Sequence, residues 1–260
     1  MGVRVNRNKK LIAEFTALAI FVCGFSAITA SEASFARESQ SSPGSKPSSH
    51  PTPSSPGVKG SFAATSSVAG CSKTDSAGHS ALLVEVPNVN APKVDKTFTL
   101  NTNCGQIVFK AFGLKAPLTI IAMTTLAKAG YFDHSLCHRL TTAGLYVLQC
   151  GDPTALGNGR LMSPEGNTWG PPDENLPTVA KTNDYPAGTI AMANNGLPNS
   201  GGSQFFIVYK DTTLPPSYSI WGVVTQGLDI VKRVAAAGVS GGGSDGKPNM
   251  TIAIESVTVK

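Results

Sequence analysis

The sequence predicts a mainly β fold, a closed antiparallel eight-stranded β-barrel with two flanking α-helices. The first observation is that short apolar runs alternate with Gly, Pro and Asn from about residue 97 onward. The second is that only two segments in this region have the pattern of a helix. Eight short strands and two helices within roughly 165 residues favour one barrel over a layered α/β domain.

The expected strands are four to eight residues long, and most are rich in Val, Ile, Phe or Thr. Each lies close to Gly, Pro or Asn, which favour turns. In chain order they are Thr97–Leu100, Gly105–Phe112, Leu136–Leu140, Gly144–Cys150, Gly188–Ala193, Ser203–Tyr209, Ser219–Val224 and Ile252–Val259.

Two segments are expected to be helical. Pro117 precedes the apolar segment Leu118–Ala129, and Gly130 follows it. Proline is favoured in the first turn of a helix, and glycine commonly ends one. The second expected helix is Gly227–Gly238, which has apolar residues at helical spacing and ends on glycine.

Composition excludes several classes of protein. Hydrophobic residues make up 41% and charged residues 14% of the 260 positions, with 27 Gly and 18 Pro, which excludes a coiled coil and a fully disordered chain. The net charge is +5, but Arg4, Arg7, Lys9 and Lys10 contribute four of the 21 basic residues within the first ten positions. The rest of the chain has no basic run, so we expect no nucleic-acid partner.

The N-terminal segment 1–30 is typical of an export signal or a membrane anchor. Its basic start is followed by Leu11–Ala30, twenty residues whose only charge is Glu14. Because the basic flank comes first, the rest of the chain is expected on the extracytoplasmic face of the membrane or secreted. The sequence leaves open whether this segment is cleaved or retained, and membrane contact is expected only through it.

Residues 31–95 are expected to form a disordered tether before the folded domain at 96–260. Positions 31–67 contain 13 Ser and 5 Pro, a composition that cannot bury a core. Val68-Ala69-Gly70-Cys71 resembles a bacterial lipobox, which makes Cys71 a candidate for lipidation. This lipobox lies far from the apolar segment that should precede it, so an unmodified linker thiol at Cys71 is the favoured interpretation.

Common cofactor sites are not expected. Gly241–Gly246 matches G-x-G-x-x-G by letter, but no strand leads into it and Lys247-Pro248 follows where a helix should begin. The chain has four His and no C-x-x-C or H-E-x-x-H motif. We therefore expect neither a cofactor nor a metal.

Four motifs recur in order and at suitable spacing in the second half of the chain. They are Cys137-His138-Arg139-Leu140, Tyr146-Val147-Leu148-Gln149-Cys150-Gly151-Asp152, Ala191-Met192-Ala193-Asn194 and Gly201-Gly202-Ser203-Gln204-Phe205-Phe206-Ile207. Together they resemble the cyclophilin family of peptidyl-prolyl isomerases, in the style of exported actinobacterial members. The resemblance covers about residues 97–260 and implies a cyclophilin-like isomerase domain at 96–260, with the cyclophilin-like barrel and X-Pro isomerisation in exported proteins.

The resemblance also implies roles for single residues. Arg139 would be the catalytic residue, and Gln149 would orient it and the substrate carbonyl. The remaining residues would bind a proline-containing peptide: Phe206, Val147, Tyr146 and Leu214 around the proline ring, and Asn194, Gln204 and Ala193 along the peptide backbone. Cys137 and Val147 stand where many members have Phe and Met, so the floor of the pocket should differ in shape.

The chemistry suits these residue types. An X-Pro bond rotates over a barrier of about 18–20 kcal/mol because rotation breaks amide resonance. As the bond twists, the prolyl nitrogen gains lone-pair character, and a guanidinium can donate a hydrogen bond to it. The alternative is a non-catalytic module or holdase that binds proline peptides in the same groove. In either case we expect a monomer that acts on segments of unfolded or exported proteins.

Cysteine spacing predicts one disulfide in the domain. Cys137 and Cys150 lie on two strands joined by a short connection, so antiparallel pairing would bring them near each other. Two alternatives remain at this point: both are free buried thiols, or Cys104 is the partner of either one.

Overall fold

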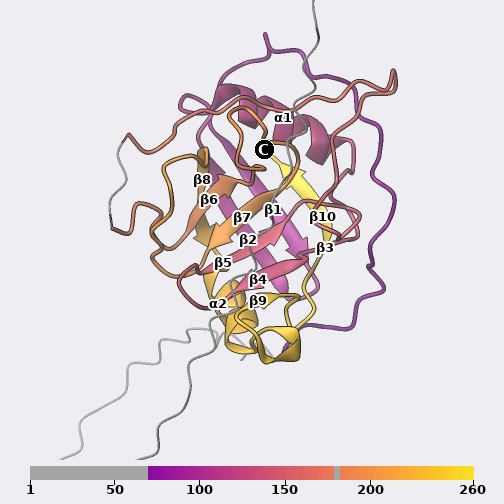
Figure 1. Cartoon of the computed structure of the whole chain (residues 1–260). Coiled ribbons are helices and arrows are strands. Elements are labelled where there is room, and N and C mark those ends of the chain that lie inside the picture. The colour runs from indigo at the N-terminus through magenta and orange to yellow at the C-terminus, as the bar shows by residue number, and fades with distance from the viewer. Residues whose placement is uncertain (1–69, 179–181) are drawn as a thin grey trace, which may run out of the picture. The chain divides into compact units, whose positions relative to one another are not determined.

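The computed structural model describes residues 70–178 and 182–260. These residues form a mainly β domain with one antiparallel sheet of ten strands and two α-helices (Figure 1). The order of strands in the sheet is β3-β10-β1-β2-β8-β6-β7-β5-β4-β9. The strands are β1 Lys96–Thr102, β2 Gly105–Ala111, β3 Ser135–Leu136, β4 Arg139–Thr141, β5 Val147–Cys150, β6 Thr189–Met192, β7 Phe205–Val208, β8 Ile220–Gln226, β9 Asp245–Gly246 and β10 Ala253–Val259.

The number of strands corrects the expectation of eight. Every expected strand overlaps an observed one, but the segment Leu136–Leu140 is divided between β3 and β4 because Cys137 and His138 leave the ladder. β3 pairs with β10, whereas β4 pairs with β5. The added strand β9 lies in the glycine-rich loop and pairs with β4.

The closed barrel is not confirmed by the strand pairings. Within the described residues the hydrogen-bonded row is open, with β3 at one end and β9 at the other. The chain itself brings the two ends near each other, because only Cys137 and His138 separate β3 from β4. The sheet therefore curves back on itself, and closure by a continuous ladder stays a prediction.

The two helices agree with the sequence prediction. α1 is Pro117–Lys128 and α2 is Leu228–Ala236, and they lie at opposite ends of the strands in Figure 1. The start of α1 has no local side-chain cap. Instead, the Glu174 carboxylate accepts hydrogen bonds from Leu118 N at 3.1 Å and Thr119 N at 2.8 Å. A distant carboxylate thus pairs with the free N–H groups of this helix.

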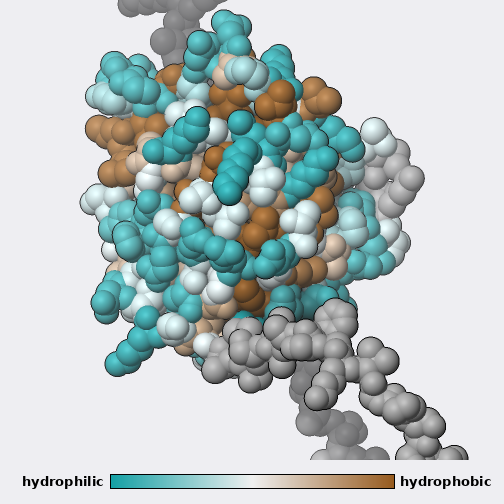
Figure 2. Space-filling view, turned by 180° about the vertical axis from the view of Figure 1, so that it is seen from behind, coloured by the Kyte–Doolittle hydropathy of each residue, from teal (hydrophilic) through white to brown (hydrophobic). Residues whose placement is uncertain are grey.

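The main core lies inside the curved sheet and beneath α1. It contains a group of mutually packed aromatic rings, in which Trp221 stands edge-on to Phe98, Phe109 and Phe205 at centroid distances of 5.1–5.9 Å. Edge-on packing of this kind is favoured by the quadrupole of aromatic rings. On the face turned away in Figure 1, apolar side chains form separate patches between hydrophilic ones (Figure 2).

Residues 70–95, here called the strap, differ from the disordered tether expected there. Cys71 forms a disulfide with Cys104, and Val84 is buried in the main core with 5% of its surface exposed. The strap forms no helix or strand, yet these contacts hold it on the domain. The segment 1–30 and the rest of the tether, 31–69, lie outside the described residues. Neither described helix is long and apolar enough to cross a membrane.

Candidate active site

Two neighbouring strands, β5 and β7, separate the main core from a second apolar cluster. Side chains on a strand alternate between its two faces. Leu148 on β5 and Phe205 on β7 pack into the main core. Their neighbours Val147 and Phe206 belong to the second cluster, on the outer face of the sheet.

This second group, here called the outer cluster, forms a shallow apolar seat. Phe206 is 5% exposed, and the ring of Tyr218 stands edge-on to it at 5.5 Å. Tyr185 is fully buried below the seat, where burial raises its pKa to about 12. The members are the buried Val147, Tyr185, Ala191, Phe206 and Val208, with the partly buried Leu145, Ala193, Leu214, Tyr218 and Ile220 packed around them.

Polar side chains continue the row that Phe206 begins. Phe206 pairs across the sheet with Gln149, which in turn pairs with Arg139. Arg139 Nη1 donates to Gln149 Oε1 at 3.1 Å, and Gln149 Nε2 donates to Gln204 Oε1 at 2.8 Å. Because paired strands lie about 4.8 Å apart, the backbones of Arg139 and Phe206 are about two strand spacings apart, with both side chains on the same face of the sheet. An extended peptide can contact both.

Asp245 on β9 is the functional residue that the sequence analysis missed. Its two carboxylate oxygens accept hydrogen bonds from Arg139 Nε and Nη2, both at 2.7 Å. The hydrogen bond to Arg139 lowers the pKa of Asp245 and raises that of Arg139, so both are charged at neutral pH. The two residues lie 106 positions apart, and no spacing pattern signals their contact.

These contacts leave part of the guanidinium group available. A guanidinium has five N–H donors. Asp245 takes two of them and Gln149 takes one, which leaves one N–H on each of Nη1 and Nη2. The Arg139 side chain is 40% exposed, so these donors can reach a ligand from solvent.

A groove of about 740 Å³ begins beside the polar row. Gln149, Ala193, Asn194 and Gln204 line it. The loop between β5 and β6 also lines it, through residues 157–161 and 168–170, and so does the segment 199–203 before β7. Asn194 is held in place by a hydrogen bond from its Nδ2 to Ser217 O at 2.8 Å. The candidate peptide-binding residues thus lie at the edge shared by the groove and the outer cluster.

Tyr146 does not lie with the other candidates. Its ring packs against the main core, 6.0 Å from the ring of Tyr209, and Lys210 Nζ lies 4.2 Å from its centroid. The expectation that both Tyr146 and Val147 line one pocket was wrong for Tyr146, because adjacent residues of an extended chain face opposite sides. Leu214 does pack at the edge of the outer cluster, as expected.

The cysteines form two disulfides. Cys137 is joined to Cys150, the pair that the sequence predicts, behind Arg139 and Gln149 on the core side of the hairpin. Cys104 is joined to Cys71 instead. This corrects both interpretations of Cys71, as a lipidation site and as a linker thiol. A sulfur atom in a disulfide is not a linker thiol, and it cannot carry a lipid.

His138 lies between the two strands of the divided segment. Both ring nitrogens are buried and have no hydrogen-bond partner in the described part of the chain. Burial lowers the pKa of His138, and the nearby carboxylate of the fully buried Asp152 opposes this shift. His138 is therefore neutral at pH 7. The described residues contain no cluster of His, Cys, Asp and Glu able to hold a metal ion.

Comparison with known proteins agrees with this arrangement. Residues 97–259 match the family described as cyclophilin type peptidyl-prolyl cis-trans isomerase/CLD. The probable peptidyl-prolyl cis-trans isomerase B of Mycobacterium tuberculosis (strain H37Rv) is 44% identical over 161 residues, which are 60% of this chain and 52% of that protein. The Mycobacterium leprae protein of the same name is 37% identical over 195 residues, 72% of this chain and 65% of that protein. The chain thus spans between half and two thirds of the length of these relatives.

A solved structure has a similar fold. The crystal structure of a Cryptosporidium parvum cyclophilin type peptidyl-prolyl cis-trans isomerase is 26% identical, with a TM-score of 0.54 over 64% of this chain and 98% of that one. A second structure of it, in the presence of the dipeptide Ala-Pro, has a TM-score of 0.52 over 63% of this chain and 98% of that one.

Proposed function

Because the chain belongs to the cyclophilin-type peptidyl-prolyl cis-trans isomerase family, we propose that it accelerates the rotation of X-Pro bonds, with Arg139 as the catalytic residue. The observation that carries the proposal is the row of Phe206, Gln149 and Arg139 across three paired strands. This row sets an apolar seat beside a charged donor. A proline ring and the amide nitrogen within it need those two contacts next to each other.

In the proposed mechanism the proline ring rests on Phe206 within the outer cluster. The free N–H groups of Arg139 then face the prolyl nitrogen, whose lone pair can accept a hydrogen bond only when the amide is twisted. Such a contact stabilises the transition state and not the planar ground state, so it raises the rate. Asp245 and Gln149 hold the guanidinium plane in place, and no proton transfer is needed.

The substrates we propose are proline-containing segments of peptides and unfolded proteins. Gln149, Gln204 and Asn194 present polar groups at the edge of the seat, where they can bind the peptide backbone. The Ala-Pro dipeptide named with the Cryptosporidium parvum relative supports this substrate class. We infer a monomer, since the proposed site is built from a single chain.

The test is a proline-tetrapeptide isomerisation assay with the full chain, followed by an affinity measurement for the same peptide. Turnover in the wild type that is lost in Arg139→Ala supports catalysis by this site. Peptide binding without turnover in the wild type would contradict it and establish the alternative, a binding module.

We also propose that the chain is exported. Two observations support this: the basic start followed by the apolar segment 11–30, and the two disulfides of the domain. Disulfides form and persist mainly in oxidising compartments. Protease treatment of intact cells should digest the domain, or the domain should be found in the medium. A domain that is protected in intact cells and absent from the medium would contradict export.

A further inference from the structure

We propose that the strap positions one wall of the groove, residues 157–161 and 168–170, so that residues 70–95 determine how the protein accepts the peptide residues that flank the proline. This inference rests on the proposed function and names a determinant of substrate choice for the same site. The strap lies outside the matched family region, residues 97–259.

The strap is first anchored at the turn between β1 and β2. There the Cys71–Cys104 disulfide is flanked by two hydrogen bonds, from Ser72 N to Asn103 O and from Asn103 Nδ2 to Ser72 O, both at 2.8 Å. A covalent bond next to two hydrogen bonds fixes this end of the strap on the sheet.

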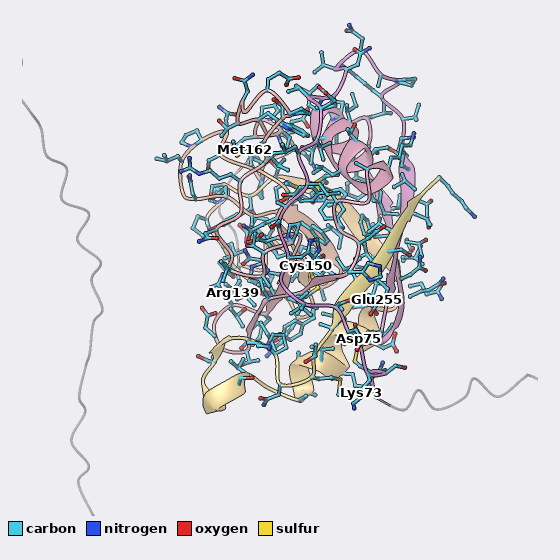
Figure 3. The ribbon with its side chains drawn as sticks, turned by 90° about the vertical axis from the view of Figure 1, so that its right-hand side faces the viewer. Lys73, Asp75, Arg139, Cys150, Met162 and Glu255 are labelled. Atoms are coloured by element: carbon cyan, nitrogen blue, oxygen red, sulfur yellow. A yellow bond between two sulfur atoms is a disulfide. The ribbon has the colours of Figure 1, made fainter. Side chains whose placement is uncertain are left out.

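A second anchor lies on β10. The Glu255 carboxylate accepts hydrogen bonds from Thr74 Oγ1 at 2.6 Å and from Ser76 Oγ at 3.0 Å. Figure 3 shows the strap residues Lys73 and Asp75 on the same side of the domain as Glu255, with Met162 farther up in the view. Lys73, Asp75 and Glu255 all line one surface pocket. The strap therefore leads from β10 toward the loop that carries Met162.

The third set of contacts joins the strap to the groove wall. His79 N donates to Pro153 O at 2.8 Å, and Val84 N donates to Met162 O at 3.0 Å. The indole Nε1 of Trp169 donates to Val84 O at 3.0 Å. Because the Val84 side chain is also buried in the main core, this residue joins the core, the strap and the wall.

The wall depends on such contacts for its position. Between β5 and β6, the described residues form no helix or strand. Apart from the strap, the wall is held by an isolated bridge between Met162 and Thr168, by hydrogen bonds within it such as Trp169 N to Leu161 O, and by Gly159 N donating to Asp152 Oδ2 at 3.1 Å. Residues 157–161 and 168–170 of this loop line the groove together with Gln149 and Gln204. Segments with few ladder hydrogen bonds open locally at low cost, so release of the strap should loosen the wall.

The proline seat has a different support. Phe206, Gln149 and Arg139 lie on strands paired within the sheet, and the hydrogen bonds of the strap reach none of these strands. Release of the strap should therefore affect a peptide that extends along the groove and spare a short peptide that occupies only the seat. A loss of rate confined to the longer peptide indicates a role in specificity, whereas a general loss of structure would lower the rate for both peptides.

The experiment compares kcat/KM for a proline tetrapeptide with kcat/KM for peptides lengthened by four residues before or after the proline. Full-chain variants are the double variant Cys71→Ser/Cys104→Ser and the single variant Val84→Ala. The matched control is Leu83→Ala, at the neighbouring strap residue, which is 58% exposed. Hydrogen exchange at the Val84 amide reports whether the strap is released.

In one of the lengthened series we expect the ratio of long-peptide to tetrapeptide kcat/KM to fall about threefold or more in both released variants, because a displaced wall misplaces the groove contacts. In the control the ratio should stay at the wild-type value. An unchanged ratio despite faster exchange at Val84 would overturn the inference. Failure of the proposed function looks different, because the wild type would then not turn over even the tetrapeptide.

Discussion

The two faces of β5 and β7 are built from adjacent residues, yet one face packs into the core and the other borders the candidate site. On the inner face, Leu148 and Phe205 are buried under other elements and belong to the main core. On the outer face, Val147 and Phe206 belong to a small cluster bordered by the polar row of Gln149 and Arg139. A single pair of strands thus supplies stability on one side and a ligand seat on the other.

The difference shows why the site can be shallow without weakening the fold. Because side chains alternate between the two faces, the packing of the inner face does not depend on which side chains occupy the outer face. The Cys137–Cys150 disulfide strengthens this division, because it joins the segment just before β4 to the end of β5 on the core side, while the side chains of Arg139 and Gln149 contact each other on the outer face. Substitutions on the two faces should therefore separate activity from stability.

The largest expected effect is on activity alone. Arg139→Ala should lower kcat/KM by about a hundredfold or more, as is usual when a transition-state donor is removed. The melting temperature should change little, because the Arg139–Asp245 ion pair is partly exposed and contributes little to stability. Arg139→Lys keeps the charge but loses the planar fork, and should recover only a small part of the rate. Wild-type turnover in Arg139→Ala would refute the assignment.

A pair of neighbouring substitutions compares the two faces directly. Phe205→Ala should lower the free energy of unfolding by about 3–5 kcal/mol, because it opens a cavity in the main core. Phe206→Ala should cost less stability, since its cluster is small, and should lower kcat/KM more than Phe205→Ala does at a temperature where both are folded. Denaturant unfolding and the tetrapeptide assay measure the two quantities. Equal stability losses would mean that the outer cluster is part of the core.

Asp245→Asn tests how the guanidinium is held. Asn cannot accept both N–H groups of Arg139, so the side chain gains freedom and kcat/KM should fall about three- to tenfold, mainly through kcat. High salt should lower the wild-type rate toward that of the variant, because this ion pair is partly exposed. Asp229→Asn, at the ion pair with Arg233 on α2, is the control and should leave the rate unchanged.

The smallest expected effect is a pH dependence of stability. Burial lowers the pKa of His138 below its ordinary value of 6.5, so below that pH the unfolded state binds the proton more readily than the folded state. Stability from this residue is therefore complete above pH 6.5 and declines as the pH falls through the lowered folded pKa. Denaturant unfolding of His138→Gln across this range should show a flatter profile than the wild type. Parallel profiles would exclude His138 as the source.

The sequence alone was sufficient for the parts of the molecule that local patterns control. Apolar runs bounded by turn residues located every long strand, and Pro117 and Gly130 marked the ends of the first helix within two residues. The motif around Arg139 and Gln149 placed these two residues on paired strands, where the structure has them directly opposite each other. Cys137 and Cys150 were close enough in sequence for pairing to be inferred.

Only the tertiary structure decided the contacts between distant segments. Asp245 meets Arg139 because β9 pairs with β4 at the end of the sheet, and the strap is tied down by Cys104 and Val84, neither of which has a local signal. Tyr146 was expected beside Val147 in the pocket because the two residues are neighbours in one motif. On an extended chain, however, consecutive side chains point to opposite faces. Local propensity depends on neighbours in sequence, whereas strand pairing, core burial and ion pairs depend on neighbours in space, which become known only when the sheet is assembled.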